Sequence, residues 1–144
     1  MNYFFDTSAL FKLFVAEPNA VEVQKIYADT QNIIWVSELA RPEFYSAVMR
    51  RFRGKQLSKK QLISISNNFE SIWSNLIIIP FDLSYFAKAE NLIKTVGKKQ
   101  NLRTLDAFQL AAFQSEATPD WQFLTADIGF VNAVTSLKIN VLNV

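Results

Sequence analysis

The sequence predicts an α/β domain in which helices cover both faces of a mostly parallel β-sheet. Its apolar runs are short and continuous, as expected of strands buried on both faces, and segments with helical spacing of apolar residues separate them. The chain has 144 residues, of which 50% are apolar and 19% are charged, so it fits one folded domain over residues 1–144 and is too apolar for intrinsic disorder.

Five apolar runs are predicted to be the strands. The first ends at Phe5, directly before Asp6, and the third is closed by Pro80, which cannot donate a backbone hydrogen bond within a sheet. The predicted strands are residues 4–5, 33–36, 76–79, 121–124 and 139–142.

Seven segments have apolar residues at helical spacing, and local signals mark where several of them begin or end. Ser58 and Thr104 are candidate N-caps, Pro18 ends the first helix, and Gly97 is the predicted C-terminal stop of the fifth. The predicted helices span residues 8–15, 19–30, 37 or 42 to 52, a segment after Ser58, 83–96, 104–115, and a short segment that Asp127 opens.

The composition limits the chemistry that the chain can perform. It contains no Cys and no His, which excludes disulfides, thiolate metal sites, histidine bases and the Ser-His-Asp triad. Any metal must be held by oxygen atoms, and such sites suit Mg²⁺ or Mn²⁺.

Charge and hydropathy are less specific. The net charge of +2 permits a nucleic-acid partner without arguing for one. The first six residues contain no basic segment of the kind that opens a signal peptide, and no apolar run is long enough to span a bilayer, so we expect a cytoplasmic protein.

Four carboxylates are candidates for a common site. Asp6 and Asp127 follow the first and fourth strands, Asp106 lies in the first turn of the sixth helix, and Glu43 lies early in the third. Because functional groups of parallel α/β sheets gather beyond the carboxyl ends of the strands, all four can face one edge. Each also has a purely structural interpretation: Asp6 and Asp127 as N-caps, Asp106 as a residue favoured by the helix dipole, and Glu43 as a solvated helix residue.

Clustering of these acids would require a cation. Two carboxylates about 4 Å apart repel by roughly 4 kcal/mol at an effective dielectric constant near 20, so some would remain protonated unless a divalent ion were present. Three or four acids without histidine therefore indicate a Mg²⁺ or Mn²⁺ site, which could activate water and neutralise charge on a phosphodiester.

The same residues lie in four segments that resemble the motifs of PIN domains, in the order typical of that family. These segments are Phe5-Asp6-Thr7-Ser8-Ala9-Leu10, Ser37-Glu38-Leu39-Ala40-Arg41-Pro42-Glu43-Phe44-Tyr45-Ser46-Ala47, Leu102-Arg103-Thr104-Leu105-Asp106-Ala107-Phe108-Gln109-Leu110-Ala111 and Phe123-Leu124-Thr125-Ala126-Asp127. The resemblance spans essentially the whole chain, and the most similar subgroup is the VapC-type toxins.

The resemblance implies a three-layer α/β/α sandwich with a mostly parallel five-stranded sheet. It also implies a Mg²⁺- or Mn²⁺-dependent endoribonuclease that hydrolyses RNA with a metal-activated water, forms a homodimer and is inhibited by a VapB-type antitoxin protein. By position, Asp6 and Asp106 would be the principal metal ligands, and Glu43 and Asp127 would complete the catalytic acidic pocket. Ser8 or Thr125 would supply a supporting hydroxyl.

Two residues depart from the family pattern. Gln109 occupies a position where the family often has His, although that His is not a required ligand. Pro42 precedes Glu43 directly and disfavours a helical conformation at Arg41, so the helix either starts at Pro42 or is distorted in its first turns.

Two basic groups could contact RNA phosphates. One surrounds Gly54 and is equally well explained as a solvated helix end. The other precedes the sixth helix and includes Lys98, Lys99 and Arg103; because it lies next to the proposed site in sequence, it is the better candidate. The members of the group around Gly54 are Arg50, Arg51, Arg53, Lys55, Lys59 and Lys60.

Two other functions remain open at this stage. The first is a non-catalytic RNA-binding or interaction module on the PIN fold, against which the presence of all four acids counts. The second is a phosphotransfer domain with a reactive Asp, against which the position of Asp6 after the first strand and the absence of Lys near Thr125 count.

Overall fold

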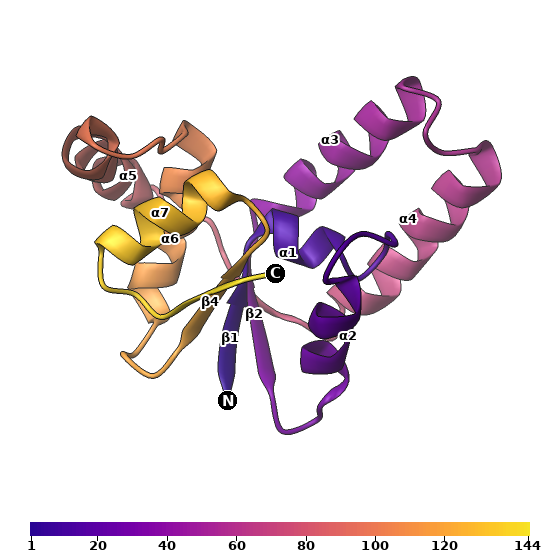
Figure 1. Ribbon diagram of the computed structural model, residues 1–144, viewed down its shortest axis with the longest axis horizontal. Helices are drawn as coiled ribbons and strands as arrows, with labels where there is room; N and C mark the ends of the chain where they lie inside the picture. Colours follow the sequence, from indigo (N-terminus) through magenta and orange to yellow (C-terminus); the bar gives the residue numbers. More distant parts are fainter.

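The computed structural model describes all 144 residues and contains one five-stranded sheet, with every strand parallel to its neighbours. The strand order is β3-β2-β1-β4-β5, so the chain starts in the middle of the sheet. The three-layer α/β/α sandwich is therefore confirmed, with all strands parallel (Figure 1). The strands are β1 (Asn2–Phe5), β2 (Ile33–Ser37), β3 (Ile77–Ile79), β4 (Gln122–Thr125) and β5 (Val141–Asn143).

Helices cover both faces of the sheet: α5, α6 and α7 lie together on one side in Figure 1, and α1 to α4 lie on the other. None of them is long and apolar enough to cross a membrane. The helices are α1 (Thr7–Phe11), α2 (Ala20–Ala28), α3 (Ala40–Arg53), α4 (Lys59–Trp73), α5 (Tyr85–Thr95), the 3₁₀ helix η1 (Val96–Lys98), α6 (Thr104–Glu116) and α7 (Ile128–Ser136).

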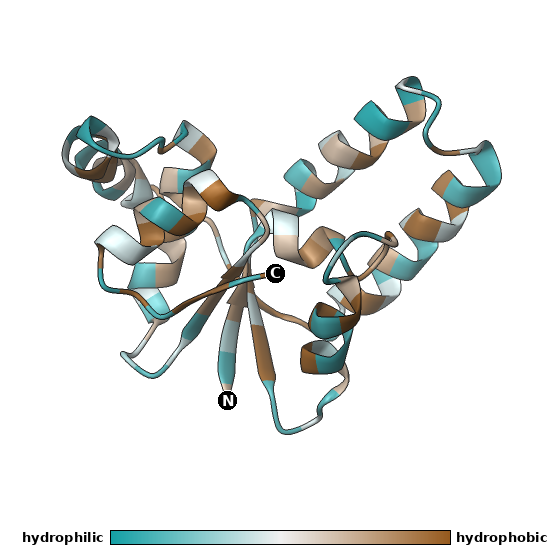
Figure 2. Ribbon diagram, viewed as in Figure 1, coloured by the Kyte–Doolittle hydropathy of each residue, from teal (hydrophilic) through white to brown (hydrophobic).

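The sheet separates two hydrophobic cores. Phe4 packs into the core beneath α5, α6 and α7, whereas the next residue, Phe5, packs into the core beneath α1 to α4. Successive side chains of a strand point to opposite faces, which explains why these runs are continuously apolar. The end of α3 and the start of α4 project beyond the sheet and carry hydrophilic residues (Figure 2).

Several predicted helix ends differ from the structure by one or more residues, and three of them have a clear local reason. α1 ends at Phe11 and not at residue 15, because Lys12, Leu13 and Phe14 form bonds to residues three positions earlier. α5 ends at Thr95, one residue before its predicted end, but Gly97 is not a left-handed stop: it lies inside η1 without a positive φ, so the chain continues by one 3₁₀ turn. The N-cap of α6 is Arg103, and Thr104 is its first helical residue.

Candidate active site

One cavity of about 810 Å³ brings together the four carboxylates named from the sequence. Asp6 follows β1 directly and Asp127 opens α7 after β4, so both lie at the carboxyl edge of adjacent strands. Glu43 from α3 and Asp106 from α6 line the same cavity from helices on opposite faces of the sheet.

Asp6 is the most buried member of this group, with 4% of its surface exposed. Its Oδ1 caps α1 by accepting from the Ala9 N–H at 2.8 Å, and it also accepts from the Ser8 hydroxyl at 2.8 Å. Burial raises the pKa of Asp6 to about 7, assisted by the negative charge of Asp106 and opposed by hydrogen bonds from Thr125, Ala9 and Ser8. Asp6 is therefore both an N-cap and a carboxylate held in a poorly solvated place.

Asp106 lies in the first turn of α6, where its Oδ2 accepts from the Arg103 N–H at 3.3 Å. Burial raises its pKa, and the charges of Asp127 and Glu43 raise it further, whereas the N–H and the charge of Arg103 oppose the shift. The carboxylates of the cavity are thus near enough to repel one another.

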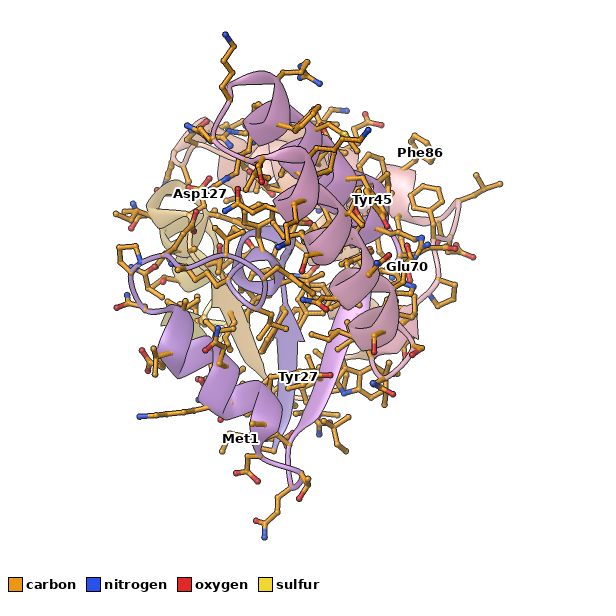
Figure 3. The ribbon with its side chains drawn as sticks, turned by 90° about the vertical axis from the view of Figure 1, so that its right-hand side faces the viewer. Met1, Tyr27, Tyr45, Glu70, Phe86 and Asp127 are labelled. Carbon is orange, nitrogen blue, oxygen red and sulfur yellow. The ribbon has the colours of Figure 1, made fainter.

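Asp127 is the N-cap of α7, with Oδ1 accepting from the Gly129 N–H at 2.8 Å and the Phe130 N–H at 3.2 Å. Its Oδ2 lies 3.4 Å from the Arg103 guanidinium, whose side chain is 66% exposed. Because this cation is exposed, it does not close the cavity. Figure 3 labels Asp127 beside α7, well away from Tyr45 and Glu70, which lie side by side on α3 and α4. The Tyr45 hydroxyl donates to Glu70, and Tyr45 does not line the cavity.

Pro42 neither starts α3 nor displaces Glu43. The helix begins at Ala40, so Pro42 is its third residue, at a position whose N–H has no partner within a helix. The Glu43 N–H then bonds to the Leu39 carbonyl at 3.3 Å, and the side chain reaches the cavity. Both alternatives that the sequence suggested for this segment are therefore replaced by an ordinary first turn.

Glu43 is held by two residues that the sequence analysis did not assign to the site. Its Oε2 accepts from the Thr7 hydroxyl at 2.6 Å and from Gln109 Nε2 at 2.6 Å. The signal for Gln109 was present: it is the one polar residue in the otherwise apolar segment 107–113 of α6, all of which is buried. Thr7 gave no comparable signal.

The two supporting hydroxyls both lie beside Asp6. The Ser8 Oγ donates to Asp6 Oδ1 and accepts from the Ala126 N–H at 2.8 Å, which ties α1 to the end of β4. The Thr125 Oγ1 lies 3.2 Å from Ser8 Oγ and accepts from the Asp127 N–H at 3.1 Å.

The cations around the cavity come from both basic groups. Arg103 lines it, as do Arg50 and Arg51 of α3. Lys98 and Lys99 are exposed on and after η1 and lie outside its lining, so the structure does not bring them to the acids. Arg51 is paired with Glu17 and lies over the Phe11 ring, whereas Arg50 is exposed and has no ion-pair partner.

The donor set fits an oxygen-preferring cation. No three carboxylates are arranged as a ready-made metal site. However, each of the four carboxylates in the cavity could supply oxygen ligands, and burial, followed by repulsion from neighbouring carboxylates, raises the pKa of both Asp6 and Asp106. A divalent cation would relieve that repulsion.

Comparison with known proteins agrees with the fold. The PIN domain family model matches residues 3–134. VapC20 of Mycobacterium tuberculosis, described as a toxin that cleaves the sarcin–ricin loop, is 13% identical, with a TM-score of 0.69 over 91% of this chain and 94% of that one.

Two further solved structures are similar over nearly their whole length. The VapBC2 structure from Rickettsia felis, bound to a promoter DNA fragment, is 17% identical, with a TM-score of 0.69 over 99% of this chain and 98% of that one. FitAcB from Neisseria gonorrhoeae is 19% identical, with a TM-score of 0.64 over 98% of this chain and 96% of that one. No curated protein sequence matches the chain. With the family model covering most of its length, the chain belongs to the PIN domain family.

Proposed function

We propose that this protein is a Mg²⁺- or Mn²⁺-dependent endoribonuclease and the toxin of a toxin–antitoxin pair. The observation that carries the proposal is the convergence of four carboxylates, from four separate elements, on one cavity at the carboxyl edge of the sheet. Asp6 and Asp106 have raised pKa values, and strongly perturbed carboxylates in a cavity are typical of functional sites.

Each residue has a definite task in this proposal. Asp6 and Asp106 are the principal ligands of the divalent cation, and Glu43 and Asp127 bind it directly or through water. The bound cation would supply Lewis acidity, lowering the pKa of a water and neutralising charge on the phosphodiester. The hydroxyls of Ser8 and Thr125 keep Asp6 oriented toward the cavity through their hydrogen bonds at the end of β4.

The arginines at the cavity supply contacts to the RNA backbone. Arg50 on α3 and Arg103 before α6 approach from opposite sides of the sheet, so a strand crossing the cavity passes between two cations. Lys98 and Lys99 are exposed nearby in sequence and remain candidates for more distant phosphate contacts.

The solved relatives support the biological setting. They include a toxin that cleaves the sarcin–ricin loop and complexes named VapBC2 and FitAcB. We therefore propose a VapB-type antitoxin protein as the partner, a homodimer as the assembly and the cytoplasm as the location.

Asp106→Asn tests the proposal directly. We expect wild-type protein to cleave RNA when Mn²⁺ is supplied and to lose cleavage with EDTA, and the Asp106→Asn variant to lose at least 100-fold in rate because a ligand charge is removed. Glu116→Gln, on the exposed end of the same helix, is the matched control and should cleave normally. RNA binding without cleavage by wild-type protein would instead support a non-catalytic RNA-binding module.

A further inference from the structure

Gln109 is a buried polar residue whose hydrogen bonds all converge on one side of the cavity. It is 2% exposed and lies one helical turn after Asp106 on α6. Its Nε2 donates to Glu43 Oε2 at 2.6 Å and to Thr7 Oγ1 at 3.0 Å. Thr7 Oγ1 in turn donates to Glu43 Oε2 at 2.6 Å, which closes a triangle of three side chains from α1, α3 and α6.

The partners of Gln109 determine which way its amide faces. Reversing the amide would place its carbonyl oxygen 2.6 Å from a carboxylate oxygen, where two acceptors would repel. The observed orientation uses the Nε2 donors fully but leaves Oε1 buried without a hydrogen-bond partner. An orphaned buried acceptor is unfavourable, so this position is not explained by packing alone.

The triangle also connects the two halves of the molecule. Phe44, next to Glu43, belongs to the core beneath α1 to α4, whereas Leu110, next to Gln109, belongs to the core beneath α5 to α7. Gln109 is therefore a polar bridge between helices on opposite faces of the sheet, made at the edge where the carboxylates gather.

These hydrogen bonds from Thr7 and Gln109 hold the Glu43 carboxylate in one orientation. Both donors bond to Oε2, and neither engages Oε1. A long, flexible side chain is thereby held in one orientation, with one oxygen occupied by the protein and the other left out of the triangle. Ligands of metal sites are commonly oriented by such supporting hydrogen bonds.

We propose that Gln109, together with Thr7, is a positioning residue that orients Glu43 for a divalent cation. The inference rests on the proposed function, because it assigns Gln109 to the cation site of the same cavity. Gln109 itself contacts no reacting group; it acts through Glu43.

Gln109→Met is the decisive variant, since Met has a similar length and no hydrogen-bond donor. We expect the dissociation constant for Mn²⁺, measured by calorimetry, to rise about 10- to 100-fold. In RNA cleavage, kcat should fall by a similar factor while KM for RNA changes less than about twofold, because Arg50 and Arg103, the proposed contacts to the RNA backbone, are unchanged. Gln114→Met, at an exposed position of the same helix, is the control and should behave as wild type.

A double-mutant cycle separates positioning from a merely structural role. If Gln109 acts through Glu43, then Gln109→Met should have little further effect on Mn²⁺ affinity in a Glu43→Gln background. An equal loss in both backgrounds, or wild-type Mn²⁺ affinity in folded Gln109→Met protein, would overturn the inference. If Gln109→Met does not fold, as judged by circular dichroism, Thr7→Val removes the second donor and is compared with Thr7→Ser, which keeps it.

The Mn²⁺ readout distinguishes this inference from the proposed function. Wild-type protein that binds Mn²⁺ but cleaves no RNA refutes the nuclease proposal, and the cycle still decides the role of Gln109. Wild-type protein that binds no Mn²⁺ refutes the cation site and the inference with it.

Discussion

Replacing Asp6 with asparagine removes a charge that the fold accommodates poorly and retains the cap that the fold needs. Asn and Asp are equally good N-caps, and an amide oxygen can accept from the Ala9 N–H as the carboxylate does. The variant is therefore expected to gain stability without metal and to lose its response to metal. The gain in stability follows from the raised pKa of Asp6, and the lost response follows from its proposed role as a cation ligand.

The sign and size of the effect come from that pKa. It rises from 3.8 in a solvated chain to about 7 in the folded protein. Between these values the unfolded state releases its proton first, so folding stability falls as pH rises, and the loss is complete above about pH 7. At about 1.36 kcal/mol per pKa unit, ionised Asp6 destabilises the folded state by about 4 kcal/mol, of which about 3 kcal/mol develops between pH 5 and pH 8.

Urea unfolding in EDTA, followed by circular dichroism, measures this difference. We expect the stability advantage of the Asp6→Asn variant to grow by about 3 kcal/mol from pH 5 to pH 8, a midpoint shift of roughly 1–2 M urea. At pH 8, Mn²⁺ at about 100 times its dissociation constant should then stabilise wild-type protein by about 2.7 kcal/mol and the variant much less. Asp120→Asn, at an exposed loop position, is the control.

Two results would refute this reasoning. One is an Asp6→Asn variant that is less stable than wild type at pH 8 without metal. The other is equal stabilisation of both proteins by Mn²⁺, which would place any bound cation away from Asp6.

Two further predictions concern RNA contact and the core. Arg50→Gln should weaken RNA binding for all sequences and reduce the slope of log K against log salt by about 1, whereas Arg53→Gln, on the same helix but outside the cavity, should change it less; fluorescence anisotropy at several salt concentrations measures both. Phe44→Ala should lower the free energy of unfolding by about 3–5 kcal/mol in a urea titration, because Phe44 is fully buried and stacks on Phe69 with ring centroids 3.9 Å apart; a loss below about 1 kcal/mol would contradict the packing described for this core.

The order and type of the elements could be predicted because they depend on local patterns. Continuous apolar runs such as residues 33–36 identify strands buried on both faces, and the carboxyl-end rule for parallel sheets then brings Asp6 and Asp127 to one edge. Helix ends were less predictable. Gly97 is a residue type that commonly ends helices, but the backbone there has no positive φ and continues as the 3₁₀ helix η1.

The contacts that complete the site could not be predicted, because they join residues far apart in sequence. Gln109 bonds to Glu43 and Thr7, which lie 66 and 102 positions away. Similarly, the sequence could not show which members of the two basic groups reach the cavity: Arg50, Arg51 and Arg103 do, and the lysines do not. That depends on helix direction: α3 carries Arg50 past the acids, whereas Lys98 and Lys99 lie on the exposed surface at η1.

The structural and functional interpretations of the capping aspartates can now be weighed against each other. For Asp127, which is partly exposed and paired with Arg103, capping of α7 is a sufficient reason for an acid. For Asp6 it is not sufficient. A good N-cap contributes about 1 kcal/mol, and Asn would provide it without a charge. The raised pKa, in contrast, corresponds to a net destabilisation of about 4 kcal/mol by ionised Asp6, with its hydrogen bonds included. An ionised carboxylate at this position is therefore unfavourable for folding by itself, and the cation of the proposed function would offset that cost.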